Sequence, residues 1–438
     1  MDDMHLMPSE TPSSRRRFKE PIVELTFACG RAIRRKAKSL WTGIRRVCHN
    51  LALLLPFLVL TASLVLVITG AFRIRIIESS QYNQLATRYW AGASGTYAQI
   101  SLFTRWGAAA AGQAVTPIGY DKSFTENEIL SLREQIHKLI MDSQRDSSGK
   151  RVNAADMDGK TLWIDSYASE VVSMLSRADR TDVAWVSATI TGVGGEYDKV
   201  QQIPMLYGSF FRSGDFDTRK IVLDQNLAFA LFASYDVEGK KVMIGSQEYT
   251  ITGVCSQIDS PEAEATYGEG PRAYIPFSEL AQFSSSGGVM PDPWGGGGGQ
   301  INASTDNIAV MYYSAVIPDP LSGLAMEQLG QSMEMVGKST TNFLIIENSG
   351  RFSLSRIWDT VFPIGARNYA SSEYRLPFYE HSARIAEGRI FYWWIIIFLC
   401  GFASLLSVAS IYGRFSAKRR LVKKKKKTSG DSFDMISF

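Results

Sequence analysis

Two long apolar runs without a charged side chain constrain this sequence more than any other feature. Residues 51–72 and residues 390–412 contain no Asp, Glu, Lys or Arg. At 1.5 Å of rise per residue, a helix over the first run is about 33 Å long, close to the hydrocarbon thickness of a bilayer. The second run opens with FYWW at 391–394, and aromatic side chains gather at membrane interfaces. We therefore expect two transmembrane helices.

The segments outside the two runs are basic, and their charge predicts the orientation. Residues 1–50 hold eleven Lys and Arg against five Asp and Glu, and residues 413–438 hold nine against two. Lys and Arg concentrate on the cytoplasmic side of membrane spans. Both termini are therefore expected in the cytoplasm and residues 73–389 outside it, in a cell membrane crossed twice. The first run is too long for a cleaved signal peptide, and we expect it to be retained.

The basic ends also predict a lipid partner. Residues 21–49 mix apolar and basic side chains, as in an amphipathic helix that lies on the inner membrane surface. The tail over 413–438 carries a run of five Lys at 423–427. A nucleic-acid-binding segment is the alternative interpretation. Because the anionic inner leaflet is adjacent and satisfies the same charge, we expect the lipid bilayer, and no nucleic acid, as the partner.

Residues 73–389 are expected to form one α+β domain that folds on its own core. Apolar periodicity predicts stalk helices at 74–90 and 378–390, which flank this mixed α/β domain beside the spans. Further helices are expected over 126–142, 169–177, 226–232 and 321–336. Strands are expected over 182–191, 220–223, 272–275, 307–316 and 342–346, with a hairpin over 241–254. The last two strands and the helix between them read as a β-α-β unit.

No pattern in the sequence is typical of an enzyme or a metal site. The four His are scattered, and none has the spacing of a metal-binding motif. The sequence VGKST at 336–340 lacks the first Gly of a phosphate loop, because Ser332 stands there, so Gly337 is expected to cap a helix. Cys255 is the one Cys of the expected outer domain, which excludes an intrachain disulfide within that domain. We expect no catalytic residue, no cofactor and no metal.

The second run offers a face for close helix packing. Ala403 and Ser407 are small residues four positions apart, and Ser410 lies on the same face. Small residues let helix backbones approach closely in a membrane. These three residues are the predicted site for packing against another helix. The runs lack the ionisable residues that ion-coupled carriers use, so the chain is not expected to transport anything alone.

One stretch of the outer domain, residues 204–280, resembles a known family. It contains LYGSFF (206–211), DF (215–216), IVLD (221–224), DVEGK (236–240), VMIG (242–245), YTITGV (249–254) and YIPF (274–277). Gly208 and Gly253 in this stretch suit a tight turn and a close backbone contact. The pattern resembles the periplasmic core domain of MacB-type ABC transporter permeases, the superfamily of macrolide exporters, FtsX and lipoprotein-release proteins.

The resemblance implies a function without chemistry in this chain. In the family the domain transmits motion and contacts partners, so the resemblance implies a permease-like subunit that works with a separate cytoplasmic ABC ATPase. It also implies association with a second copy or another permease subunit. Family permeases carry three more spans after this domain, whereas this sequence has one, as if truncated after its second helix. The alternatives are a two-span receptor, sensor or scaffold that binds a ligand outside the cell, and a membrane-anchored enzyme.

Overall fold

The structure is a computed structural model, and it divides the chain into two compact units. It describes residues 54–90, 97–105, 123–143, 162–180, 182, 184–212, 214–256, 260–266, 271–280, 308–361, 374 and 376–431. One unit is Phe72–Trp394, and the other combines Met1–Ala71 with Ile395–Phe438. The amphipathic helix predicted over 21–49 lies outside the described residues, as does the end of the tail at 432–438.

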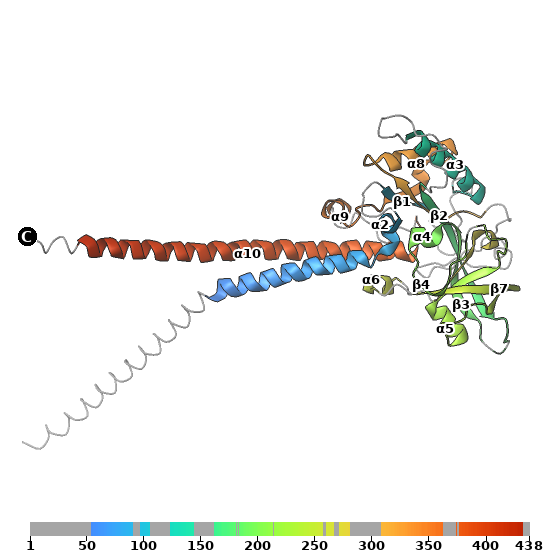
Figure 1. Cartoon of the computed structure of the whole chain (residues 1–438), viewed down its shortest axis with the longest axis horizontal. Helices are drawn as coiled ribbons and strands as arrows, with labels where there is room; N and C mark the ends of the chain where they lie inside the picture. Colours follow the sequence, from blue (N-terminus) through green and yellow to red (C-terminus); the bar gives the residue numbers. More distant parts are fainter. Residues whose placement is uncertain are drawn as a thin grey trace, which may run out of the picture. The chain divides into compact units, whose positions relative to one another are not determined.

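In the part of the chain that the structure describes, two helices are long and apolar enough to cross a membrane (Figure 1). They contain the described residues of the two predicted spans, 54–72 and 390–412. The first is Leu54–Ser79, and the second is the Phe378–Lys423 part of helix α10 (Phe378–Asp431). The stalk expected over 378–390 is the start of α10. After the first helix the chain continues through the 3-10 helix η1 (Tyr82–Gln84) and the short helix α2 (Ala86–Trp90).

The folded unit is built on one mixed sheet. Its strand order is β10-β1-β9-β2-β3-β8-β5-β7-β4, and β6 pairs with β2 and β7. The strands are β1 (Tyr97–Thr104), β2 (Ile164–Arg177), β3 (Val186–Gly195), β4 (Met205–Gly208), β5 (Lys220–Asp224), β6 (Lys241–Ile244), β7 (Gln247–Cys255), β8 (Arg272–Pro276), β9 (Tyr312–Pro318) and β10 (Phe343–Glu347). The pairs β3–β8 and β5–β7 are parallel, and the other described pairs are antiparallel.

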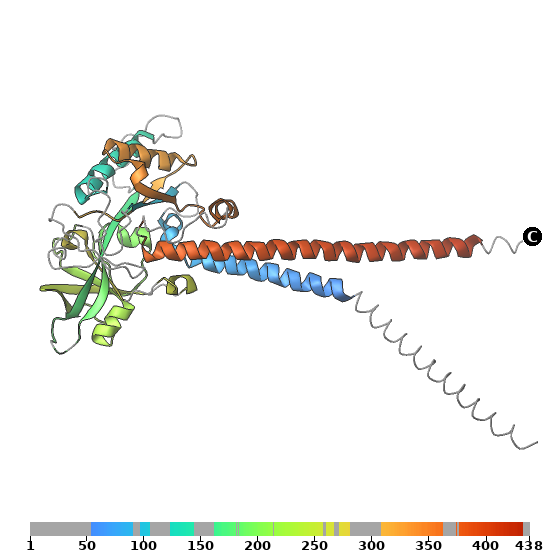
Figure 2. The same cartoon turned by 180° about the vertical axis from the view of Figure 1, so that it is seen from behind.

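Helices cover both faces of this sheet. On one face lie α3 (Glu126–Ser143), α5 (Gln225–Phe232) and α8 (Leu324–Met335), and Figures 1 and 2 show α3 and α8 side by side. Ile129, Leu132, Ile136 and Ile140 of α3 recur at helical spacing, and all four are fully buried in the main core. The other face carries α4 (Tyr197–Gln201) and a second core that includes Phe378 and Tyr379, the first residues of α10.

Most of the predicted elements of the domain are confirmed. Helices α3, α5 and α8, the β6–β7 hairpin and strands β5, β8 and β10 lie within a few residues of their expected positions. Strands β9 and β10 both pair antiparallel with β1, which lies between them, so β9-α8-β10 is a crossover unit. Gly337 has φ +77° just after α8, and the Lys338 amide donates to the Met333 carbonyl at 2.9 Å, which is the expected helix cap.

The helix predicted over 169–177 is wrong. That segment is the second half of strand β2, which pairs with β3 from Ser166 to Leu175 and with β9 and β6 at its two ends. The spacing of Val171 and Leu175 fits a helix as well as a strand, and pairing to both neighbours decides for the strand. Strand β1 is also absent from the prediction. It lies between β9 and the edge strand β10 and is buried over nearly its whole length.

Candidate functional site at the stalk of helix α10

Strand β1 presents polar side chains on the face where the stalk packs. Gln99 and Ser101 are buried, and they alternate with the apolar core residues Ile100 and Leu102. The Gln99 side chain donates to the Asn83 carbonyl at 2.6 Å and accepts from the Ala86 amide at 3.1 Å. These two bonds attach the segment that follows the first helix to strand β1 of the sheet.

Three more side chains of η1 and its N-cap extend this attachment. Asn83 donates to the Gln201 carbonyl at the end of α4 at 2.7 Å. Gln84 donates to the Tyr379 carbonyl at 3.0 Å, and Ser382 donates to Gln81 at 3.0 Å. The last two bonds join η1 directly to the first turns of α10. The two stalks are therefore held together and to the same face of the sheet.

The place where the two stalks meet the sheet is called the junction here. A buried ion cluster is its central feature. Arg351 lies between β10 and helix α9 (Leu354–Val361). Its guanidinium donates in a bidentate pair to Glu380 at 2.6 and 2.8 Å and from Nε to Glu387 at 2.5 Å. Arg384 donates to the same Glu380 carboxylate at 3.0 Å. The side chains of Arg351, Glu380 and Glu387 are at most 3% exposed.

The spacing of these residues on α10 explains how the cluster forms. Positions 380, 384 and 387 recur at four and three residues, so the three side chains share one face of the helix. Planar guanidinium groups match carboxylates bidentately, which makes Arg351 a directional link and not only a point charge. The side-chain carbonyl of Asn348 accepts a hydrogen bond from Arg351 at 3.1 Å, and its side-chain amide donates to Ser101 at 2.9 Å. The ion cluster is thus continuous with the polar row of β1.

Two further contacts support the same helix. The guanidinium carbon of Arg272 in β8 lies 4.4 Å from the centre of the Phe378 ring, a cation–π geometry. Arg389 pairs at 2.6 Å with Glu262 of the short helix α6 (Pro261–Glu264). The start of α10 therefore contacts both halves of the sheet through polar groups.

This arrangement can hold helix α10 in one position and one rotation about its axis. Its carboxylates are not arranged as a nucleophile or a general base. The carboxylates are engaged by guanidinium groups. Within the described ranges, no group of three or more His, Cys, Asp and Glu side chains is placed to bind a metal ion. Cys255 is a free thiol, and burial raises its pKa, so it is not poised as a nucleophile.

The residues predicted for helix packing lie in the unit that holds the apolar helices. Ser407 is 6% exposed, and its hydroxyl donates to the Ala403 carbonyl at 2.8 Å. Ala403 and Ser410 are half-buried. On the same face, the Ser404 hydroxyl lies 2.6 Å from the hydroxyl of Ser63 in the first helix, which is 5% exposed. In this chain the small-residue face is therefore turned toward the chain's own first helix.

The glycines of the family-like stretch allow two strands to approach closely. Gly208 of β4 has φ +66°, and a Cβ there would lie 2.2 Å from the Thr252 carbonyl oxygen. A Cβ on Gly253 of β7 would lie 2.8 Å from the Tyr207 carbonyl oxygen. Any larger residue at either position would push β4 and β7 apart. The pairing of these two strands is also irregular, with a shift of register between Met205 and Tyr207. These positions are structural.

The described part of the chain combines a mixed α/β domain with a helix on each side that is long and apolar enough to cross a membrane. Residues 80–322 match the family model of the MacB-like periplasmic core domain. Because the match covers more than half of the chain, the chain belongs to this family, that of ABC transporter permeases.

Relatives with this domain include macrolide exporters. The chain is 29% identical over 98 residues to the macrolide export ATP-binding/permease protein MacB of Chromobacterium violaceum, and 28% identical over 120 residues to that of Neisseria gonorrhoeae. The matched segments cover 22% and 26% of this chain and 15% and 18% of those proteins. The chain thus matches less than a fifth of the length of these relatives.

Solved structures of the same kind of domain are also similar. The periplasmic region of MacB from Actinobacillus actinomycetemcomitans has 15% identity and a TM-score of 0.34, and covers 57% of this chain and 89% of its own. The extracellular domain of the ABC-type transporter YknZ from Gram-positive bacteria has 16% identity and a TM-score of 0.32. It covers 57% of this chain and 99% of its own.

Sequence reasoning did not find the ion cluster. Arg351 is 29 residues from Glu380 and 36 from Glu387, and nothing local connects them. A signal was nevertheless present. The segment FYEHSARIAEGRI (378–390) places Glu380, Arg384 and Glu387 on one face beside aromatic residues, where a solvent-exposed stalk would carry its charges on several faces.

Proposed function

We propose that this chain is a membrane subunit of a MacB-like ABC transporter system, and that its folded domain transmits motion between the membrane helices and a substrate or partner outside the cytoplasm. On this proposal both termini are cytoplasmic and the domain over 73–389 is extracytoplasmic. On this proposal the energy comes from ATP hydrolysis by a separate cytoplasmic ABC ATPase, a partner supported by membership of the MacB-like family.

The observation that carries the proposal is the buried ion cluster at the start of α10. A helix that is held by apolar contacts alone can slide or rotate in small steps, whereas the Arg351, Glu380 and Glu387 bonds have one register. Movement of α10 along or about its axis would therefore move the sheet with it unless several buried bonds broke together. Breaking a buried charge pair costs about 3–5 kcal/mol, which opposes such slippage.

The small-residue face of α10 supplies helix contacts for the proposed assembly. We propose that the Ala403, Ser407 and Ser410 face keeps the two spans of this chain together, and that the paired spans then pack against another permease subunit or a second copy. In a membrane, close approach of small residues supplies the packing that holds helices together. A bulky side chain at Ser407 would separate the first helix from α10.

The test is co-purification of the tagged full chain from native membranes in mild detergent. We expect an ABC ATPase to be recovered with the wild-type chain, together with a permease subunit or a second copy. Ser407→Leu should lower that recovery severalfold. Val408→Leu, on the exposed side of the same helix, is the matched control and should recover the partners as the wild type does.

A chain that remains monomeric, with no ATPase recovered, would contradict the proposal and favour a ligand-binding receptor. Equal recovery of partners with the wild type and with Ala403→Leu plus Ser407→Leu would instead remove only the small-residue face from the proposed assembly.

A further inference from the structure

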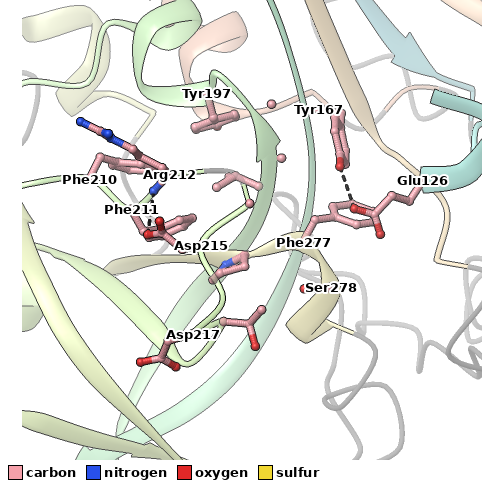
Figure 3. Close-up of a pocket in the computed structure, with 16 residues that line it drawn as sticks. Glu126, Tyr167, Tyr197, Phe210, Phe211, Arg212, Asp215, Asp217, Phe277 and Ser278 are labelled. Atoms are coloured by element: carbon pink, nitrogen blue, oxygen red, sulfur yellow. Dashed lines mark hydrogen bonds between the residues drawn. The ribbon is translucent and has the colours of Figure 1, made fainter. Parts of the chain in front are cut away.

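The folded domain contains a pocket that the proposed transmission of motion does not use. The pocket has a volume of about 220 Å³ and lies among β2, β3 and the loop after β4 (Figure 3). None of the residues of the ion cluster lines it. Aromatic rings from four segments line it: Tyr167, Tyr197, Phe210, Phe211 and Phe277. Two of these rings belong to the LYGSFF segment that marks the family resemblance.

Two glycines of β3 allow the Tyr167 ring to pack directly against the strand, and this ring forms one wall of the pocket. A Cβ at Gly194 would lie 2.1 Å from the Tyr167 ring, so the ring rests directly on the backbone of β3. Gly195 has φ +72°, and a Cβ there would meet the Asp165 carbonyl oxygen at 2.5 Å. The Phe277 ring packs edge-on against Tyr167 with 5.1 Å between centroids. Tyr167 therefore has little freedom to fill the space that it borders.

The opposite wall is a cluster of three rings. Phe210 and Phe211 lie 4.7 Å apart, and Tyr197 lies 6.5 Å from Phe210. The faces of such rings carry partial negative charge and attract cations. A compact apolar group that enters between the two walls would bury its surface without displacing a side chain from either.

Carboxylates supply the polar part of the pocket. Glu126 accepts a hydrogen bond from the Tyr167 hydroxyl at 2.7 Å through Oε1, and in the part of the chain that the structure describes its Oε2 atom has no hydrogen-bond or ion-pair partner. Asp215 and Asp217 also line the pocket. Asp215 is paired with Lys220 at 2.8 Å, and Asp217 accepts from the Arg219 amide at 3.1 Å. Glu126 is thus the lining carboxylate that combines a free oxygen with a hydrogen bond to one of the aromatic side chains of the pocket, the Tyr167 hydroxyl.

The cation of the pocket lining does not neutralise Glu126. Figure 3 shows the Arg212 guanidinium directed away from Glu126 and Phe277, while its backbone amide faces Asp215. Burial raises the pKa of Tyr167, so its hydroxyl stays protonated and remains a donor to Glu126. Arg133 lies over the Tyr167 ring at 5.2 Å, but it is paired with Asp165 at 2.8 Å. An aromatic chamber whose anionic end is not paired with a cation matches a ligand of opposite charge.

We propose that this pocket binds a small organic cation, a protonated amine on a compact aromatic or apolar group. The amine would bind Glu126, and the apolar group would lie between the rings of Phe211 and Phe277. Pockets for drug-sized ligands measure about 300–1,000 Å³, so this one suits a ligand of about one ring. The inference concerns binding by the folded domain and stands whether or not the chain couples to an ATPase.

The test uses two probes that share a ring and differ in charge. Phenethylammonium and 3-phenylpropionate are titrated calorimetrically into the full chain in lipid nanodiscs. We expect saturable binding of the ammonium, with affinity at least about tenfold above that of the carboxylate, a difference of about 1.4 kcal/mol. Glu126→Gln keeps the shape and an acceptor for Tyr167, and it should weaken ammonium binding about tenfold.

The controls separate charge recognition from folding. Glu134→Gln removes an exposed carboxylate from the same helix α3 and should leave the affinity unchanged. Phe277→Leu should weaken both probes severalfold, because it removes a ring but no charge. Equal binding of the two probes to the wild type, no saturation by the ammonium, or full affinity in a folded Glu126→Gln variant would each overturn the proposal.

Discussion

Asp224 is a buried carboxylate whose pKa is raised by burial and lowered by the hydrogen bonds that it accepts. It is 4% exposed, and its two carboxylate oxygens accept from the Leu227 amide at 2.7 Å and the Arg272 amide at 2.9 Å. It thereby caps α5 and joins β5 to β8. Burial nevertheless dominates and raises its pKa to about 6, since the anion loses more hydration than these bonds return.

This pKa predicts a pH dependence of stability. The folded-state pKa lies above the unfolded value, so the folded chain binds more protons than the unfolded chain between pH 4 and 6. The contribution to stability is complete below about pH 4, is lost as the pH rises through about 6, and amounts to on the order of 3 kcal/mol. Chemical unfolding of the detergent-solubilised chain at several pH values would measure it.

Asp224→Asn should remove this part of the slope, because the side chain no longer titrates. Relative to the wild type, the variant should lose most stability at acid pH, because the contribution of Asp224 is complete there. Asp236→Asn, at an exposed position, is the control and should leave the slope as it is. A slope between pH 4 and 6 that persists in Asp224→Asn would assign it to another group.

Among the elements, α10 differs from the other helices in what fixes it to the sheet. Helices α3 and α8 pack through fully buried apolar residues such as Ile136 and Leu329. The start of α10 adds to its apolar contacts a cluster of buried charges around Arg351. Apolar packing tolerates small shifts of a helix, whereas buried charge pairs lose most of their energy when one partner moves away.

We therefore predict that Arg351→Met destabilises the domain by about 3–5 kcal/mol, because it leaves buried carboxylates without their partner. Adding Glu387→Gln to Arg351→Met should restore part of that loss, since it removes one of the stranded charges. Arg356→Met breaks an exposed pair with Glu347 and should cost about 0–1 kcal/mol. Chemical unfolding of the four proteins would measure all three values, and a double variant no more stable than Arg351→Met would argue against the described coupling.

The sequence predicts elements with strong local signals and fails where the signal is not local. Helix α3 has four core residues at one spacing, and the β6–β7 hairpin turns at Gly245 with φ +59°, so each is recognised alone. Strand β2 was predicted as a helix over 169–177, because its two neighbours, β3 and β9, come later in the sequence. The junction and the pocket are assembled from segments more than a hundred residues apart in places, and spacing within one segment cannot reveal them.

At the scale of the whole molecule, the family and the two apolar helices indicate a membrane transport protein, and the basic flanks predict which side the domain occupies. Arg and Lys follow the apolar part of α10 at 414 and 418–420, as expected for a cytoplasmic end. Ser246 lies in the exposed turn between β6 and β7, at the surface of the folded unit.

This orientation predicts that Ser246→Cys is labelled by a membrane-impermeant maleimide on intact cells. The same reagent should reach Thr428→Cys in the tail only after the cells are permeabilised. Cys29, Cys48 and Cys400 are replaced by Ala beforehand, so that they contribute no background, and buried Cys255 is retained. The reverse pattern, with the tail labelled on intact cells, would invert the proposed topology.

The ion cluster also limits how this domain can diverge. Glu380 and Glu387 both pair with Arg351, and Arg384 pairs with Glu380. A new side chain at one of these positions is therefore expected to be tolerated only with a matching change at another. Lineages that lose Arg351 should have lost its acidic partners together with it, often in favour of apolar residues of similar volume. Across homologues, the four positions are expected to change as a group while the surrounding stalk sequence varies independently.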